Sequence, residues 1–213
     1  MVQEQKEKRG RGRPPKIKRG YGDTRDELIR SGLALITQNG FMSAGIDSIV
    51  KSVQVPKGSF YHYFQNKEAF GHAVLESYGC YFARKLDKHL QNETLSPLSR
   101  IESFVTDAKA GMARYDFKRG CLVGNMMQEV PQLSEEFSQH LQSILMDWQT
   151  RLANCLSQAK TSGEIPDTAD EQQLAVIFWS GWEGAVMRSK LFQSVKPLDE
   201  FWTYFQSTIC IRK

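Results

Sequence analysis

The chain has 213 residues, of which 40% are hydrophobic and 24% charged, and it carries a net charge of +4. These values are ordinary for a soluble globular protein, and no apolar run approaches the ~18 residues of a membrane span. The first twenty residues lack the apolar core of a secretory signal, so we expect a cytoplasmic protein without a membrane partner.

The four cysteines, Cys80, Cys121, Cys155 and Cys210, are widely scattered. They form no CxxC pair, and no histidine lies near them at metal-ligand spacing. The sequence therefore predicts reduced thiols, no metal site and no cofactor.

The basic residues are concentrated at the N-terminus. Residues 1–22 hold eight Lys or Arg against two Glu, so the remaining chain has a net charge of −2. We expect this arm to be disordered in isolation and to bind a polyanion; a solvated tail without a partner is the alternative. Arg11-Gly12-Arg13-Pro14 resembles an AT-hook core, which predicts that Arg11 and Arg13 enter a narrow A·T minor groove.

Helical patterns follow the arm. The first helix is expected to begin at Asp23-Thr24, where Thr24 and Glu27 form a capping box, and to end at Asn39-Gly40. Beyond it the apolar spacing stays helical, without strand alternation, so the expected fold is all-α. Further helices are expected at about 43–53, 57–64, 67–90, 98–115, 121–129 and 134–162, and from about 170 and 197 onward.

The segment Val55–Phe64 is the most informative part of the chain. It combines a proline, a glycine, a lysine, a serine, two tyrosines and a histidine, a set that suits phosphates and base edges better than a core. Phe60 and Phe64 are four residues apart and should face inward. The expected DNA contacts here are Lys57, Ser59, Tyr61, His62 and Tyr63.

Two flanking residues are also candidates for DNA contacts. Lys67 is expected to meet a phosphate at the start of the fourth helix, where the helix dipole favours an anion. Ser43 is expected to cap the second helix or to contact a phosphate, and the sequence leaves both roles open.

The segment from Thr24 to about Leu75 resembles the DNA-binding domain of TetR-type transcriptional regulators. The matching residues are Gly40-Phe41-x-Ser43, Ile46 through Ile49, and Val55-Pro56-Lys57-Gly58-Ser59-Phe60-Tyr61-His62-Tyr63-Phe64-x-x-Lys67-Glu68. The resemblance implies an all-helical homodimer that represses a promoter until a small molecule enters its C-terminal domain. We therefore expect a basic arm (1–22), a helix-turn-helix domain (23–68) and a helical ligand-binding and dimerisation domain (69–213).

Cys121 follows two cations and begins a short expected helix. Both features favour the thiolate, the reactive form. The stretch Arg119–Asn125 is similar to one in a branch of this family that responds to electrophiles and unsaturated acids, which implies that Cys121 senses the inducer. A small, buried and inert cysteine is the alternative.

Large aromatic side chains beside small residues suggest a pocket between the C-terminal helices. The same pattern also fits a core or a dimer interface, and the sequence does not decide between them. The candidate ligand contacts besides Cys121 are Phe104, Asn125, Trp148, Trp182 and Glu183.

These features favour a DNA-binding repressor that a small molecule, such as an electrophile or an unsaturated carboxylic acid, releases from a palindromic double-stranded operator. An enzyme is disfavoured because GxSxG, HExxH, a Gly-rich phosphate loop and paired carboxylates are missing, although a distant His could still meet Cys121. An architectural binder acting through the arm alone would leave the aromatic C-terminal half without a purpose.

Overall fold

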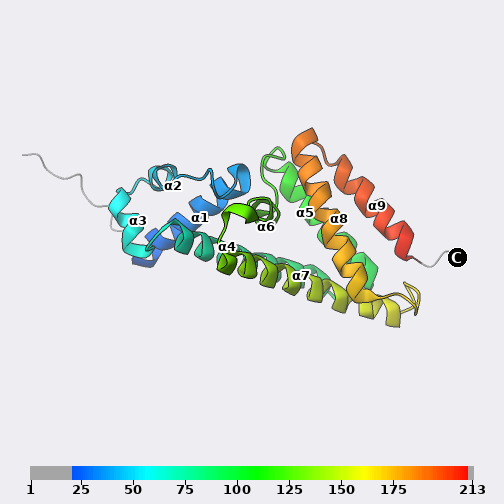
Figure 1. Cartoon of the computed structure of the whole chain (residues 1–213). Coiled ribbons are helices and arrows are strands. Elements are labelled where there is room, and N and C mark those ends of the chain that lie inside the picture. The colour runs from blue at the N-terminus through cyan, green and yellow to red at the C-terminus, as the bar shows by residue number, and fades with distance from the viewer. Residues whose placement is uncertain (1–20, 211–213) are drawn as a thin grey trace, which may run out of the picture.

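The computed structural model describes residues 21–210, and these residues are helical with connecting turns (Figure 1). None of the described helices is long and apolar enough to cross a membrane. The elements are α1 (Tyr21–Asn39), α2 (Ile46–Ser52), α3 (Lys57–Tyr63), α4 (Lys67–Leu90), α5 (Pro97–Ala113), α6 (Leu122–Met127), the 3-10 turn η1 (Val130–Gln132), α7 (Glu135–Thr161), α8 (Glu171–Phe192) and α9 (Lys196–Ile209).

The helices form two groups that α4 connects. Figure 1 shows α1, α2 and α3 together at one end, while α4 runs from this group along the molecule with α7 beside it. α8 and α9 pack against each other at the opposite end, and α6 lies between α1 and α7. The all-α expectation is confirmed.

Side-chain caps fix the start of the three longest helices. Asn66, Ser134 and Asp170 each accept hydrogen bonds from backbone N–H groups in the first turn of α4, α7 and α8. These oxygens satisfy donors that the helix itself leaves without acceptors. The predicted span of α4, 67–90, is confirmed.

The N-terminal boundaries differ from the prediction. The described part of α1 already includes Tyr21, so Thr24 lies inside the helix and is buried, and the predicted capping box was wrong. α2 begins at Ile46 with Gly45 at its cap position, so Ser43 is not its cap. The residues before α2 form a turn because Phe41 is buried and its N–H bonds a distant side chain. Arg11 and Arg13 lie outside the described residues.

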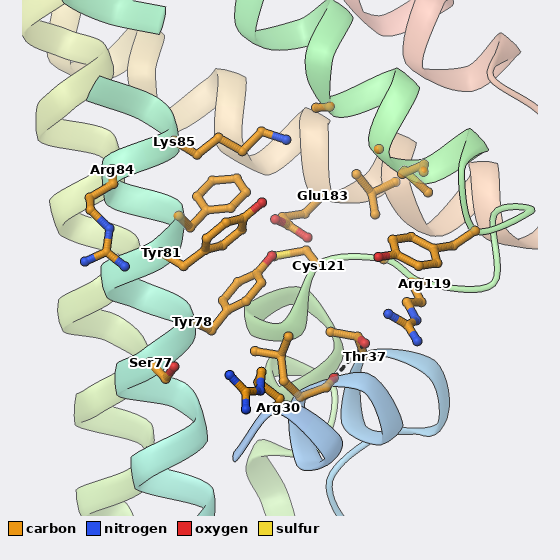
Figure 2. Close-up of a pocket in the computed structure, with 18 of the residues that line it drawn as sticks. Arg30, Thr37, Ser77, Tyr78, Tyr81, Arg84, Lys85, Arg119, Cys121 and Glu183 are labelled. Carbon is orange, nitrogen blue, oxygen red and sulfur yellow. Dashed lines mark hydrogen bonds between the residues drawn. The ribbon is translucent and has the colours of Figure 1, made fainter. Parts of the chain in front are cut away.

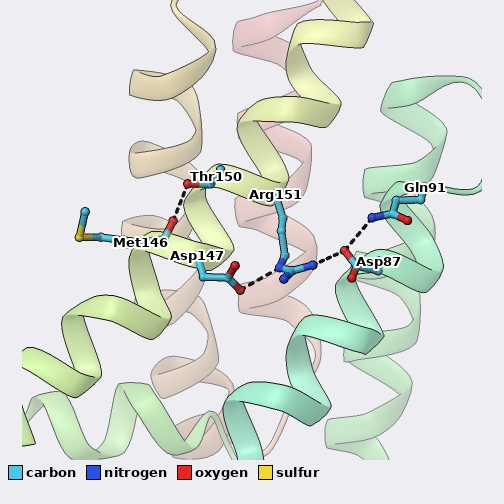
Figure 3. Close-up of polar contacts among 6 residues, drawn as sticks. All are labelled: Asp87, Gln91, Met146, Asp147, Thr150 and Arg151. Atoms are coloured by element: carbon cyan, nitrogen blue, oxygen red, sulfur yellow. Dashed lines mark hydrogen bonds and ion pairs between the residues drawn. The ribbon is translucent and has the colours of Figure 1, made fainter. Parts of the chain in front are cut away.

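An arginine bridge joins the two longest helices. Arg151 of α7 donates to Asp147, one turn earlier, at 2.8 Å, and to Asp87 of α4, as Figure 3 shows. Gln91 donates to Asp87 at 3.0 Å and completes the network. The hydrogen bond to Asp147 is the main cause that raises the pKa of Arg151. This bridge fixes α4, whose other end carries the N-terminal helices, against the rest of the chain.

Candidate DNA interface and ligand cavity

Helix α3 presents two different faces. Phe60 and Phe64 are buried and pack on Phe70 of α4, with ring centroids 5.1 and 4.9 Å away. The inward orientation predicted from their spacing is confirmed. Tyr61 and His62 are exposed on the outer face. The helix is therefore anchored by phenylalanines and offers polar aromatic side chains to a partner.

Two lysines contact the elements next to α3. Lys57 of α3 pairs with Asp47 of α2 at 3.0 Å, both exposed. Lys67 donates to the Met42 carbonyl at 2.9 Å and lies 4.9 Å from the centre of the Phe41 ring. Burial lowers the pKa of Lys67. Its amine therefore holds the turn between α1 and α2 in place.

The turn after α1 is also held by the segment that follows Cys121. Glu129 accepts hydrogen bonds from the N–H groups of Phe41 and Met42 at 2.9 and 3.2 Å. Gly40 has φ +90°, and a Cβ there would lie 2.6 Å from Glu129 Oε1, so only glycine suits both the turn and the contact. Sequence patterns give no signal for Glu129, because its partners lie almost ninety residues away.

Asn125 belongs to the same connection. Its Nδ2 donates to the carbonyls of Thr37 and Ile36 at 2.7 and 3.3 Å, at the C-terminal end of α1. It was predicted as a ligand contact, but it does not line the cavity described below. The segment α6–η1 is thus bonded to the N-terminal helices at two points.

A cavity of about 510 Å³ lies between α1, α4, α5, α8 and the loop before α6. Apolar side chains line it from α1, α4, α5 and α8, with Tyr81 and Phe82 of α4 among the lining rings. Figure 2 shows Cys121, Tyr78 and Glu183 meeting near its centre. Four cationic side chains also line it: Arg30, Arg84, Lys85 and Arg119.

Cys121 is buried in this cavity at the N-cap of α6. Its Sγ accepts a hydrogen bond from Gly124 N at 3.5 Å and from the Tyr78 hydroxyl at 3.7 Å. Burial, followed by the nearby Glu183 charge, raises the pKa of Cys121 well above its ordinary value. Burial therefore favours the neutral thiol in this state, which fits the alternative of a small, buried cysteine. The reactivity of Cys121 stays a prediction.

The two cations that precede Cys121 are engaged elsewhere. Lys118 pairs with Asp116 at 3.5 Å, and the guanidinium of Arg119 lies 4.1 Å from the centre of the Tyr115 ring. Adjacent positions in the sequence therefore do not stabilise a Cys121 thiolate here.

Glu183 of α8 is 6% exposed. Neither of its carboxyl oxygens makes a hydrogen bond of normal geometry among the described residues, and the Cys121 thiol is the neighbour that favours its carboxylate. Burial raises the pKa of Glu183 to about 7. A Cβ at Gly124 would lie 2.0 Å from Glu183 Oε2, so the glycine lets the carboxyl group pack against the first turn of α6.

The structure separates the predicted aromatic residues. Trp182 lines the cavity, whereas Phe104 and Trp148 lie in the core and do not. The Trp148 ring centroid is 4.3 Å from Phe82 and 5.2 Å from Trp179. The sequence analysis missed the cavity-lining residues of α4, although their spacing could have revealed them. These residues, at positions 78, 81, 82 and 85, recur on one face of the helix. Within residues 21–210 no group of three or more His, Cys, Asp or Glu side chains is placed to hold a metal ion.

Comparison with known proteins identifies the family. Residues 28–74 match the family model "Bacterial regulatory proteins, tetR family", and residues 97–205 match "Tetracyclin repressor-like, C-terminal domain". The transcriptional regulator AcuR of Cereibacter sphaeroides is 46% identical over 90% of this chain and 87% of its own length. The repressor NemR of Escherichia coli (strain K12) is 29% identical over 88% of this chain and 94% of its own.

Solved structures agree with these matches. A regulatory protein TetR from Rhodobacter sphaeroides has a TM-score of 0.85 at 45% identity, covering 86% of this chain and 97% of its own. The reduced form of E. coli NemR has a TM-score of 0.79 at 29% identity, covering 88% and 98%. The chain therefore belongs to the TetR family of transcriptional regulators, with an N-terminal helix-turn-helix domain and a C-terminal helical domain, and is not an enzyme.

Proposed function

We propose that this regulator is a repressor which leaves a palindromic operator when a small electrophile or unsaturated carboxylic acid binds the cavity around Cys121. One observation carries the proposal: α1 of the DNA-binding half and the loop that holds Cys121 line the same cavity. A ligand there contacts both halves of the chain at once. The relative NemR is named a transcriptional repressor.

The proposed DNA contacts follow from the outer face of α3. Its exposed side chains suit the major groove, where a recognition helix reads base edges. Phosphate contacts on either side would fix the register of the protein on DNA. We assign the groove and backbone contacts to Ser43, Lys57, Ser59, Tyr61, His62, Tyr63 and Lys67, and minor-groove contacts to Arg11 and Arg13.

A homodimer is proposed because a palindrome presents two half-sites. The outer face of α8 and α9 carries apolar side chains in water: Leu191 is 77% exposed, Tyr204 69% and Phe192 58%. A Cβ at Gly184, on the same face of α8, would meet no described atom within 4 Å, which leaves room for a close neighbour. This face suits a second copy of the chain. The domain limits 23–68 and 69–213 are proposed with it.

The chemistry of the cavity favours an unsaturated acid or carbonyl compound. Its aromatic wall accommodates a planar apolar group, and the Cys121 thiol is a nucleophile for an electron-poor double bond. A carboxylate can reach Lys85, although Lys85 already pairs with Asp107 at 2.9 Å, or Arg119 at the rim. These groups support a ligand with one anionic and one unsaturated end.

The proposed switch is a population shift. A ligand binds better to the arrangement in which α1 has moved away from α4 and α5, and in that arrangement the two recognition helices no longer match successive major grooves. The hydrogen bonds of Asn125 and Glu129 to the end of α1 and the following turn support transmission along α6.

The test starts from a duplex selected by the full-length protein from random sequences. We expect a palindromic site that is preferred over random DNA at fixed salt. Methyl vinyl ketone, as the electrophile, or crotonate, as the acid, should lower the operator affinity at least tenfold, within the usual range of coupling between sites. Cys121→Ser should lose the response to the ketone, and Cys80→Ser, at an exposed thiol, should keep it. Unchanged operator affinity with both compounds would reject the proposal.

A further inference from the structure

Glu183 is a buried carboxyl group that the structural role of its helix does not explain. Core positions on α8 such as Phe178 and Trp179 are apolar, but Glu183 lies among them with both carboxyl oxygens lacking a hydrogen-bond partner in the described part of the chain. A buried polar group without a partner destabilises a fold. Such a group at a cavity wall therefore points to a function there.

The carboxyl group and the Cys121 thiol both lie against the same residue, Gly124. Gly124 donates its N–H to Cys121 Sγ at 3.5 Å, and its Cα packs directly against Glu183 Oε2. The Tyr78 hydroxyl approaches the sulfur from α4 (Figure 2). Three elements thus meet in the cavity: α4 supplies a hydroxyl donor, the N-cap of α6 a nucleophile and α8 a carboxyl group.

We propose that Glu183 accepts the proton of the Cys121 thiol while the sulfur adds to the double bond of an α,β-unsaturated carbonyl ligand, and then returns that proton to the adduct. This inference rests on the proposed function, since it describes how the same cavity reacts with its ligand. Sγ forms a bond to the β-carbon, and the π electrons move to the α-carbon and carbonyl. The α-carbon then takes the proton from Glu183. The sum is addition of S–H across C=C, without an oxidant or reductant.

The thiol needs such a partner because it is not ionised by itself. Its pKa is raised by burial and by the Glu183 charge, so a free thiolate is scarce near neutral pH. A carboxyl group with a pKa near 7 is well matched to proton transfer at that pH. Tyr78 and Cys121 are the titratable groups that face it, and the remaining charges of the cavity wall are Arg30, Arg84, Arg119 and Lys85, which pairs with Asp107 of α5.

The Glu183→Gln variant separates this role from a purely electrostatic one by the direction of its effect. As a negative charge, Glu183 only disfavours the thiolate, so removing the charge should accelerate alkylation of Cys121. As a proton acceptor, Glu183 promotes the reaction, so its loss should slow alkylation. General bases typically contribute 10²–10⁴-fold.

The experiment measures alkylation of the full-length protein by methyl vinyl ketone, with peptide mass spectrometry, from pH 5.5 to 9. The exposed Cys80 of the same chain serves as an internal rate reference. At pH 7.5 we expect Cys121 to react at least tenfold more slowly in Glu183→Gln, while Cys80 reacts equally. Glu93→Gln, which makes the same charge change at an exposed loop position, should leave both rates unchanged.

The pH profile tests the same inference without a variant. The wild-type Cys121 rate should rise with an inflection near pH 7 and then level off, while the rate in Glu183→Gln should rise steadily with hydroxide. An equal or faster rate in Glu183→Gln, or no wild-type inflection, would overturn the role of Glu183 but leave the proposed function standing if alkylation still releases DNA. A wild-type Cys121 that is never alkylated would remove the covalent step and this inference together.

Discussion

Glu183 couples the chemistry of the cavity to the stability of the protein. In unfolded chains a glutamate has a pKa of about 4.3, whereas burial raises that of Glu183 to about 7 in the fold. A carboxyl pKa that is higher in the folded state stabilises the fold fully below the unfolded pKa. That stabilisation is lost as the pH rises towards 7.

The first prediction is that Glu183→Gln raises the free energy of unfolding much more at pH 8 than at pH 5. Gln resembles the neutral acid, so the variant keeps the free energy of unfolding that the wild type loses when the buried carboxyl group ionises. The difference between the two pKa values corresponds to roughly 4 kcal/mol at full effect. Urea unfolding at both pH values and one protein concentration measures it. An equal effect at pH 5 and pH 8 would show that Glu183 is not the titrating group.

At the same scale, the sequence predicted orientations but not environments. The four-residue spacing of Phe60 and Phe64 was enough to predict that both face inward, because which side chains share a helix face depends only on helix geometry. The two cations before Cys121 give no sign of its burial, because that burial depends on contacts with α4 and α8. Glu183 was a candidate because it stands in an apolar helical neighbourhood, whereas its contact with Gly124 joins residues far apart in the chain.

The segment α6–η1 acts as the element that joins the cavity to the helix-turn-helix domain. Cys121 is the N-cap of α6, and Glu129, between α6 and η1, accepts hydrogen bonds from two N–H groups of the turn between α1 and α2. A hydrogen bond to a charged group contributes roughly 1.5–3 kcal/mol when protected from water, and less at this partly exposed position.

The second prediction concerns Glu129→Ala. Loss of both hydrogen bonds should lower the free energy of unfolding by about 1 kcal/mol and weaken the link between ligand and DNA. The ratio of operator affinities without and with alkylated Cys121 should therefore move towards one. Fluorescence anisotropy with labelled operator measures both affinities. Glu102→Ala, an exposed position on α5, is the matched control, and an unchanged ratio in Glu129→Ala would contradict transmission through this element.

The third prediction concerns the start of α4. Lys67→Ala should weaken binding similarly on operator and random DNA, and lower the slope of log affinity against log salt by about one, because one phosphate contact is lost. Lys88→Ala, an exposed lysine in the last turn of the same helix, should leave the slope unchanged. If the slope stays the same in Lys67→Ala, then its bond to the Met42 carbonyl is its whole role.

Helix boundaries were predictable where the signal is local. α4 was predicted at both ends, and its start depends on Asn66, which caps its own first turn. The cap of α2 was missed by two residues, Gly45 in place of Ser43, because Phe41 is drawn into contacts with Phe137 and Glu129. Phe137 lies in α7 and Glu129 follows α6, so the local sequence before α2 does not reveal the turn that starts at Phe41.

For the whole molecule, repression of a palindrome requires two recognition helices at a fixed separation, about 34 Å along the DNA. A single chain carries one α3. The exposed apolar face of α8 and α9 lies at the opposite end of the molecule from α3 (Figure 1). A pairing at that face leaves both DNA-binding ends free, which is the geometry that two half-sites need.

The last prediction tests this pairing with Leu191→Glu. Leu191 is the most exposed large apolar side chain on α8, and a charge there would have to be buried without a partner in the dimer. We expect a monomer by analytical ultracentrifugation and an operator affinity at least 100-fold weaker, since the two half-sites no longer bind as one unit. Met146→Glu, at an exposed apolar position on α7, should remain dimeric and bind normally. A Leu191→Glu protein that is still dimeric would place the pairing surface elsewhere, and a monomer with full affinity would show that one recognition helix is enough.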